Sequence, residues 1–372
     1  AERLDWPGEF KDATEKYSSQ VALDKNDFLT GYTAGMPFPI VNLDDPKAAV
    51  KIAYNWHMGP FMPDDFTLAP WGSFTYALSD SSNTFEHEET HDYVCSKFTF
   101  LRYAHRTEVD PRPSLGSNKD GVEWKSKCDD WTMDADGNFG AKGIWIRYLD
   151  PFKTDDFFYF TRRGGFRIGH QDSYDALDES CRTCHQPYWA YALPKNEQFT
   201  YRLLGTTRIL ASLTANEEPA GIVRGEKGMT FGEEPFQLRN AYILEMTPRI
   251  PGYEHLPEIV YIDTEAYVWL AAEFYDERER TATALPLWRT KPSPSGGYHF
   301  DLAGEFYFPT GQLRSRHMQV DGAFPFVHQE DVTATAYFRT MAPAHGDISQ
   351  KINGGNLDAD AFLPKALSGR QH

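Results

Sequence analysis

The stretch that decides the fold class is residues 298–308, which read Tyr-His-Phe-Asp-Leu-Ala-Gly-Glu-Phe-Tyr-Phe. Apolar side chains alternate with polar ones over most of this stretch, and alternation of this kind is typical of a strand with one buried face. The same pattern recurs along the chain, at residues 94–103, 144–149, 157–160, 207–213, 241–246, 267–275 and 333–339. The sequence therefore predicts a mainly β protein of the α+β class.

Turn-forming residues stand between several of these stretches. Asp-Gly-Asn occupies residues 136–138, Gly-Gly residues 164–165 and Ser-Gly-Gly residues 295–297. Because such residues reverse the chain tightly, we expect antiparallel neighbours joined by hairpins. The sequence shows no repeat of fixed period, which argues against a propeller or a solenoid.

One helix is predicted over residues 46–56. Asp44 or Asp45 can cap its start, and Pro46 stands near its first position, where a proline is well tolerated. Apolar residues then recur along one side, at positions 49, 52, 53 and 56. This stripe predicts that the helix packs against a sheet.

The composition narrows the class of protein. The chain has 372 residues, 41% of them hydrophobic, and a formal net charge of −17. An acidic surface repels a phosphate backbone, so nucleic-acid binding is excluded as a first hypothesis. The longest apolar runs have the length of a strand, so we expect no membrane-spanning helix. The chain starts at Ala1 without an initiator Met, as it would after signal-peptide cleavage or after trimming, and we expect an exported protein.

Five segments, in order and spread over most of the chain, carry a family resemblance. They are residues 31–39 (Gly-Tyr-Thr-Ala-Gly-Met-Pro-Phe-Pro), 45–51 (Asp-Pro-Lys-Ala-Ala-Val-Lys), 158–163 (Phe-Tyr-Phe-Thr-Arg-Arg), 238–248 (Leu-Arg-Asn-Ala-Tyr-Ile-Leu-Glu-Met-Thr-Pro) and 261–264 (Tyr-Ile-Asp-Thr). On these segments the chain resembles an uncharacterised family of exported bacterial proteins that is similar to the outer-membrane lipoprotein-sorting (LolA/LolB-like) proteins.

The resemblance implies a fold and a location. The expected fold is a large curved antiparallel sheet, an incomplete barrel, wrapped over one or more helices and enclosing an apolar groove. Members are thought to carry or sense hydrophobic molecules in the periplasm of Gram-negative bacteria, often beside envelope transport systems. The family has no established catalytic residues, so none is carried over. We expect an N-terminal extension over residues 1–30, a single β domain over 31–342 and a C-terminal tail over 343–372.

One pentapeptide departs from the family pattern. Cys181-Arg-Thr-Cys184-His185 has the form in which two thiols bind a haem covalently and the adjacent imidazole ligates the iron. Random placement of the cysteines and histidines of this chain would give the pattern on the order of once in a thousand sequences. The sequence thus predicts one covalent haem c, on an insertion over residues 170–195.

Other uses of this pentapeptide remain open. A small disulfide loop between Cys181 and Cys184 needs no histidine, and a zinc site would need a fourth ligand. A thioredoxin-like site would need a strand-to-helix junction, which the neighbouring residues do not supply. Cys95 and Cys128 are predicted to form a disulfide, as isolated thiols tend to do outside the cytoplasm, and two buried thiols are the alternative.

The sixth ligand of the iron is a further prediction. His170 precedes His185 by fifteen residues and is our candidate distal ligand. Met229, Met58 and His57 compete with it, and an open iron position would indicate ligand binding or peroxide chemistry instead of electron transfer.

A second candidate metal site lies at His87 and His91. The two side chains would share one face of a helix, with Glu88 beside them. The alternative is a solvated polar turn, because a predicted strand follows directly and the sequence supplies no third ligand of the usual kind.

Two classes of function therefore compete. The first is a periplasmic mono-haem cytochrome on a hydrophobic-ligand fold, which passes electrons to a redox partner or acts on a small molecule. The second is a carrier of a lipid or another hydrophobic molecule, with two disulfides and no cofactor. The sequence favours an electron-transfer or binding protein over a hydrolase, although a haem oxidoreductase is compatible with it. It does not identify the ligand or the oligomeric state.

Overall fold

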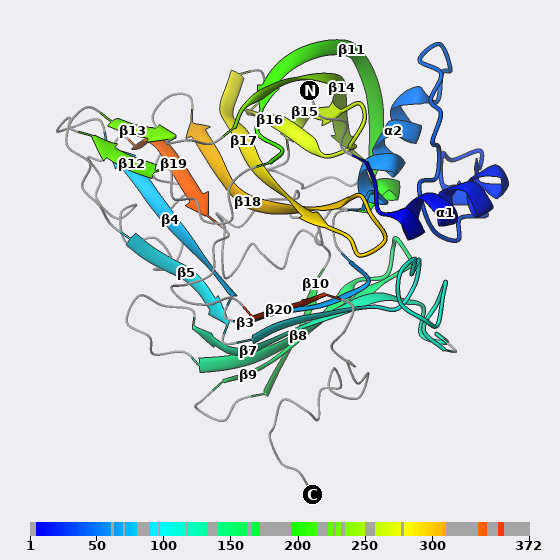
Figure 1. Ribbon diagram of the computed structural model, residues 1–372, viewed down its shortest axis with the longest axis horizontal. Helices are drawn as coiled ribbons and strands as arrows, with labels where there is room; N and C mark the ends of the chain where they lie inside the picture. Colours follow the sequence, from blue (N-terminus) through cyan, green and yellow to red (C-terminus); the bar gives the residue numbers. More distant parts are fainter. Residues whose placement is uncertain are drawn as a thin grey trace, which may run out of the picture.

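The computed structural model describes residues 5–60, 63–69, 71–79, 89–95, 97–116, 118–132, 140–161, 166–171, 195–214, 222–225, 228–231, 235–249, 257–276, 279–309, 334–340 and 349–352 (Figure 1). Within these ranges the chain has two α-helices, α1 (Gly8–Tyr17) and α2 (Ala48–His57), and two short 3-10 helices, η1 (Ser18–Gln20) and η3 (Asn196–Gln198). The rest of the regular structure is β, as the alternating pattern predicts.

Sixteen strands form one antiparallel sheet. They are β3 (Asp65–Ala69), β4 (Trp71–Ser79), β5 (Glu89–Cys95), β6 (Lys97–Arg102), β7 (Val122–Thr132), β8 (Gly140–Tyr148), β9 (Asp155–Thr161), β10 (Phe166–Gln171), β11 (Phe199–Ala211), β14 (Gln237–Pro248), β15 (Pro257–Asp263), β16 (Trp269–Asp276), β17 (Glu279–Pro292), β18 (Tyr298–Pro309), β19 (Ala334–Thr340) and β20 (Ser349–Ile352). Two small antiparallel pairs stand apart, β1 (Ala22–Leu23) with β2 (Leu29–Thr30) and β12 (Ile222–Gly225) with β13 (Gly228–Phe231).

The sheet is open and branched. Its main path runs β10-β9-β8-β7-β5-β4-β19-β18-β17-β16-β15-β14-β11. At β7 it forks, because β6 pairs along most of β7 while Val94 of β5 pairs with Thr132 at its end. The two ends of the path, β10 and β11, do not pair with each other among the described strands, so this sheet does not close into a barrel. Figure 1 shows it curling from a lower arm (β3 and β7 to β9) to an upper arm (β11 and β14 to β16).

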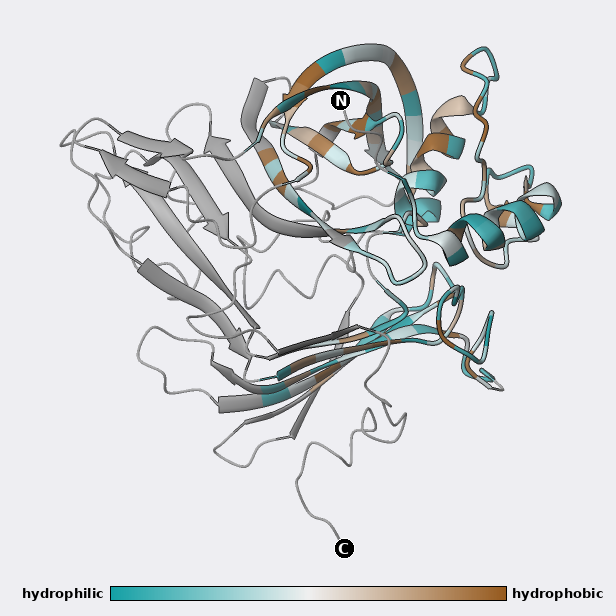
Figure 2. Ribbon diagram, viewed as in Figure 1, coloured by the Kyte–Doolittle hydropathy of each residue, from teal (hydrophilic) through white to brown (hydrophobic). Residues whose placement is uncertain are grey.

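Helix α2 matches the predicted helix and packs against β11. It begins later than the predicted caps: Lys47 is its N-cap, and the Asp45 carboxylate accepts the Lys47 N–H at 2.8 Å in the turn before the helix. Its predicted apolar stripe is buried, with Ile52, Ala53 and Trp56 fully inaccessible in the main core. Along β11 the side chains alternate between more and less buried positions. Figure 2 shows hydrophobic and hydrophilic bands along this strand, and some of its apolar residues are exposed, such as Leu210 at 61%.

The hairpin predicted at residues 295–297 is confirmed. It joins β17 to β18, and Gly296 and Gly297 both adopt positive φ, 83° and 76°, which favours glycine. The N-terminal segment rests on this hairpin, because the Gly8 N–H donates to the Gly296 carbonyl at 3.1 Å. Helix α1 then buries Phe10 in the same core as Trp56.

Two further observations concern the ends of the chain and the membrane. Inside the expected C-terminal tail, β20 pairs with β3, so this part of the tail is a strand of the main sheet. None of the helices in the described ranges is long and apolar enough to cross a bilayer.

Candidate functional site

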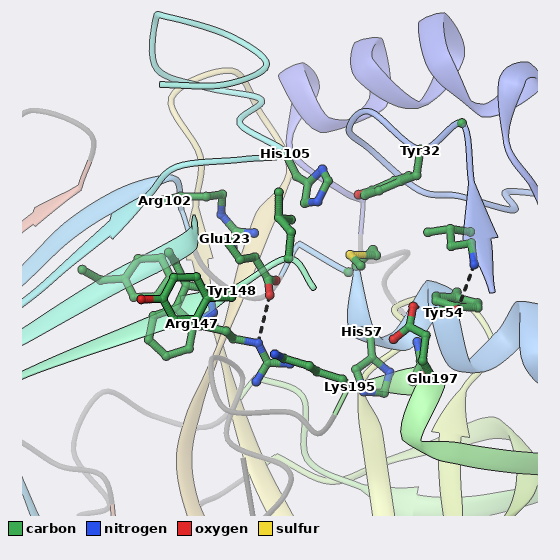
Figure 3. Close-up of a pocket in the computed structure, with 18 residues that line it drawn as sticks. Tyr32, Tyr54, His57, Arg102, His105, Glu123, Arg147, Tyr148, Lys195 and Glu197 are labelled. Carbon is green, nitrogen blue, oxygen red and sulfur yellow. Dashed lines mark hydrogen bonds and ion pairs between the residues drawn. The ribbon is translucent and has the colours of Figure 1, made fainter. Parts of the chain in front are cut away.

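A partly open cavity of about 250 Å³ lies between the end of α2 and the lower arm of the sheet (Figure 3). Segments distant in sequence meet around it: the β2 region, the end of α2, strands β6, β7 and β8, and the η3 turn. Its lining consists of Leu29, Gly31, Tyr32, Tyr54, His57, Met58, Gly59, Phe100, Arg102, His105, Glu123, Trp124, Arg147, Tyr148, Leu149, Lys195, Asn196 and Glu197.

A β-bulge brings Glu123 to this cavity. Val122 pairs with Tyr148 and Trp124 pairs with Arg147, so Glu123 is an extra residue in β7. A bulge of this kind changes the direction of a side chain relative to the regular alternation. Glu123 therefore lines the same cavity as its neighbour Trp124, although consecutive strand residues normally point to opposite faces.

Glu123 and Arg147 form a buried ion pair. Arg147 Nε donates to Glu123 Oε2 at 2.9 Å, and the two side chains are 6% and 18% exposed. Burial acts to raise the pKa of Glu123, but the charges of Arg147, His105 and Arg102 outweigh it and hold that pKa below its usual range. Burial likewise acts against the charge of Arg147, yet Glu123 and Asp155 raise its pKa. Both groups are therefore ionised at neutral pH.

Two buried N–H donors at the cavity lack an acceptor among the described residues. They are Nη1 of Arg147 and Nδ2 of Asn196. The amide oxygen of Asn196 accepts the Tyr201 hydroxyl at 2.7 Å, which fixes the orientation of this side chain. Buried donors without an acceptor are costly, so these two atoms mark a place where an acceptor is missing.

Lys195 adds a third positive charge beside Arg102 and Arg147. Its Nζ donates to the carbonyls of Asp150 and Lys153 at 2.8 Å each and lies 3.2 Å from the Asp155 carboxylate. Burial lowers its pKa, and Asp155 opposes this shift. Because its hydrogen atoms are engaged, Lys195 contributes charge to the cavity rather than a donor.

The remaining carboxyl group of the lining is held toward its neutral form. Burial raises the pKa of Glu197, whose Oε1 accepts the Tyr54 hydroxyl at 2.9 Å. Burial also raises the pKa of Tyr54, so this hydroxyl stays protonated. The lining therefore has three cationic side chains, one fully ionised carboxylate and one carboxyl whose charge is disfavoured.

The two histidines of the lining are fixed by carbonyl oxygens. His57 Nδ1 donates to Ala53 O at 2.9 Å, and His105 Nδ1 donates to Thr33 O at 2.8 Å. Burial lowers the pKa of His105, which is therefore neutral at neutral pH. Its ring packs on Tyr32 with centroids 4.6 Å apart.

The cavity also has an aromatic wall, made by Phe100 and Trp124. Their centroids are 5.4 Å apart, and each continues into a cluster of rings. Phe66 stacks on Phe100 at 5.1 Å, and Trp145 meets Trp124 edge-on at 5.3 Å. These positions share one face of the sheet because Phe66 pairs directly with Phe100. The site therefore combines an apolar wall with a positively charged one.

Four residues predicted from the sequence lie outside the described ones: Cys181, Cys184, His185 and His87. His170 lies on β10 opposite Asp156 of β9, and Met229 lies on β13.

The other two candidates for the sixth iron ligand, His57 and Met58, both line the cavity.

Only His91 of the predicted metal pair at His87 and His91 lies within the described residues. His91 lies within strand β5, opposite Phe74 of β4, so the chain from residue 89 onward is extended. The metal pair itself stays a prediction, because His87 lies outside the described part of the chain.

Cys128 is disulfide-bonded. Cys95 is the last residue of β5, the strand that pairs with the end of β7. Its pairing with Cys128 stays a prediction, because its side chain lies outside the described ones.

The sequence analysis did not predict the charged residues of the cavity, although the sequence contains one pattern that indicates a buried charge. Trp145 and Arg147 are two residues apart in a predicted strand, so a positive charge shares the face of an aromatic residue. Such a placement indicates a buried, partnered charge. Lys195 and Glu197 carried no comparable signal.

Comparison with known proteins gives a match over the N-terminal part of the chain. Residues 2–105 match the family model described as "Protein of unknown function (DUF1329)". This match contains two of the five segments on which we based the resemblance, 31–39 and 45–51, and the other three lie beyond it. No curated protein matches the sequence.

Three solved structures are similar at low sequence identity. A Vibrio parahaemolyticus domain described as an outer-membrane lipoprotein-sorting protein has a TM-score of 0.46 and 12% identity, covering 86% of this chain and 98% of that one. A DUF1329 protein of Desulfovibrio piger has a TM-score of 0.44 and 13% identity, covering 82% and 92%. A LolA superfamily protein of Nitrosomonas europaea has a TM-score of 0.41 and 11% identity, covering 86% and 99%.

The predicted mono-haem cytochrome is corrected by these findings. The matched family model is described without a haem or an electron-transfer role. The described residues also contain no group of three or more His, Cys, Asp or Glu side chains placed to hold a metal ion. The haem c, its iron and the electron-transfer role are therefore withdrawn. The reason for the error is physical: five residues specify an attachment chemistry but contain no information on the pocket that would enclose a porphyrin.

Proposed function

We propose that this protein is a carrier without haem that binds one end of a hydrophobic molecule in the cavity between α2 and the lower arm of the sheet. The observation that carries the proposal is the aromatic wall of Phe100 and Trp124 facing a partly open cavity. Apolar and aromatic side chains around a concave site, with a few polar groups, are the usual features of small-molecule sites.

The size of the cavity supports a partial fit. At about 250 Å³ it is smaller than the roughly 300–1,000 Å³ of sites that enclose a whole drug-sized molecule. The cavity would therefore hold one end of a longer molecule, and Phe100 and Trp124 would contact its apolar part. A periplasmic location is part of this proposal, and it rests on the resemblance found in the sequence.

Native mass spectrometry tests the proposal. The purified chain is incubated with a bacterial lipid extract, separated from unbound lipid and weighed intact. We expect an adduct of one lipid per chain. A Met58→Trp variant fills the cavity and should lose the adduct, whereas Leu210→Trp, at a site 61% exposed on β11, should keep it. Absence of an adduct with the unmodified chain, or equal adducts with both variants, would overturn the proposal.

A further inference from the structure

The buried polar atoms that lack a hydrogen-bond partner in the described lining of the cavity are all donors. Among its described lining residues, the buried side-chain atoms without a partner are both N–H donors, Arg147 Nη1 and Asn196 Nδ2. Neither Glu123 nor Glu197 has a buried oxygen in the same situation. Acceptor oxygens on a bound molecule would satisfy these two donors.

The charges around these donors specify the acceptor further. Arg147 is almost fully buried; its Nε donates to Glu123, and its Nη1 has no partner among the described residues. Arg102 also lines the cavity, and its Nε lies 3.8 Å from Asp64, beyond ordinary hydrogen-bond distance. Lys195 contributes a third positive charge. An anionic oxygen is a stronger acceptor than a neutral one when the donor is a guanidinium.

We infer that the molecule bound in this cavity ends in an oxyanion, a carboxylate or a phosphate, which accepts hydrogen bonds from Arg147 and Asn196. The inference rests on the proposed function and specifies its ligand class: an amphiphile with an anionic end, whose apolar part contacts Phe100 and Trp124. Arg102 and Lys195 stabilise its charge. Two buried donors that lack acceptors in the described chain would thereby be satisfied.

The test compares three probes by isothermal titration calorimetry. Laurate and dodecanol share a chain length and differ in the charge of the head group, and inorganic phosphate supplies an anion without a chain. We expect laurate to bind roughly 10-fold to 100-fold more tightly than dodecanol, which corresponds to one or two charge-assisted hydrogen bonds. Phosphate should bind more weakly than laurate because it lacks the apolar contacts.

Two variants locate the effect. Arg147→Gln should abolish the preference for laurate over dodecanol. Because this change also breaks the pair with Glu123, Asn196→Asp is the second variant: it preserves an oxygen for Tyr201, adds a negative charge and should weaken laurate more than dodecanol. Arg202→Gln is the matched control, since Arg202 is 69% exposed and pairs with Glu245 on β14, and it should leave the preference unchanged.

The outcomes separate this inference from the proposed function. Equal affinities of laurate and dodecanol for the unmodified chain would contradict an anionic end on the ligand and would still agree with the proposed carrier function. Failure of both to bind would overturn the carrier as well. Phosphate binding as tightly as laurate would show a site for a free anion and overturn the amphiphile.

Discussion

Replacing Arg147 with Gln should destabilise the fold, and the structure sets the size of the effect. Removing one partner of a buried ion pair typically costs about 3–5 kcal/mol because the other charge stays buried. Glu123 is 18% exposed, and Arg102 also stabilises its charge, so the lower end applies. We expect Arg147→Gln to lower the free energy of unfolding by about 3 kcal/mol near neutral pH.

Urea denaturation followed by circular dichroism measures this loss, and a double variant checks its cause. Arg147→Gln combined with Glu123→Gln removes both charges, so its loss should be smaller than the sum of the two single losses. The cost of Arg147→Gln alone should also shrink as the pH falls below about 4.3, the ordinary pKa of glutamate, because protonation then removes the uncompensated charge. Additive losses, or a cost that does not change with pH, would refute the buried pair as the source.

Three other predictions concern the cavity, the hairpin and the core. Glu197→Gln should raise the thermal stability near neutral pH, because the raised pKa of Glu197 in the folded state means that its contribution to stability is complete below the ordinary glutamate pKa and is lost as the pH rises through the folded value. The gain should therefore vanish in acid. A gain that does not depend on pH in thermal melts would contradict this prediction. Gly297→Ala should destabilise the fold more than Gly296→Ala in the same melts, because a Cβ at position 297 would lie 2.0 Å from the Trp6 carbonyl oxygen whereas a Cβ at position 296 would meet open space. Equal losses of stability would contradict the close contact. Trp56→Ala should lower the free energy of unfolding in urea by about 3–5 kcal/mol because Trp56 is fully buried. Phe152→Ala, at a site 62% exposed, should lower it little. A small loss for Trp56→Ala would contradict the placement of Trp56 in the core.

Local patterns were sufficient to predict the elements of the fold. The alternation in residues 298–308 specifies a strand because it reflects one buried face, and β18 spans this stretch. The apolar stripe that ends at Trp56 likewise predicted α2. The start of α2 differs from the prediction, because Lys47 is its N-cap and Asp45 accepts a hydrogen bond in the preceding turn.

Long-range pairing lay beyond the sequence. β19 pairs with β4, which is more than 250 residues earlier in the chain, and β7 serves both β5 and β6. No local sequence pattern specifies which strands become neighbours, because this pairing depends on the packing of the whole sheet.

The cavity could not be predicted for the same reason. Arg147, Lys195 and Tyr54 come from separate elements and meet only when the sheet is formed. The bulge at Glu123 shifts a side chain by one position, which a regular alternation does not anticipate. The pentapeptide ending at His185 attracted attention because its chemistry is local, whereas the cavity is a property of the tertiary structure.

Photo-crosslinking shows whether an anionic amphiphile binds in this cavity. A laurate analogue with a diazirine on its chain is bound to the full-length protein, irradiated, and located by peptide mass mapping. We expect the label on the cavity segments, at residues 57–59 and 100–105 and at Trp124, and we expect excess unlabelled laurate to remove it. Label confined to exposed outer positions such as Leu210 and Leu238, or label that laurate does not displace, would contradict the account.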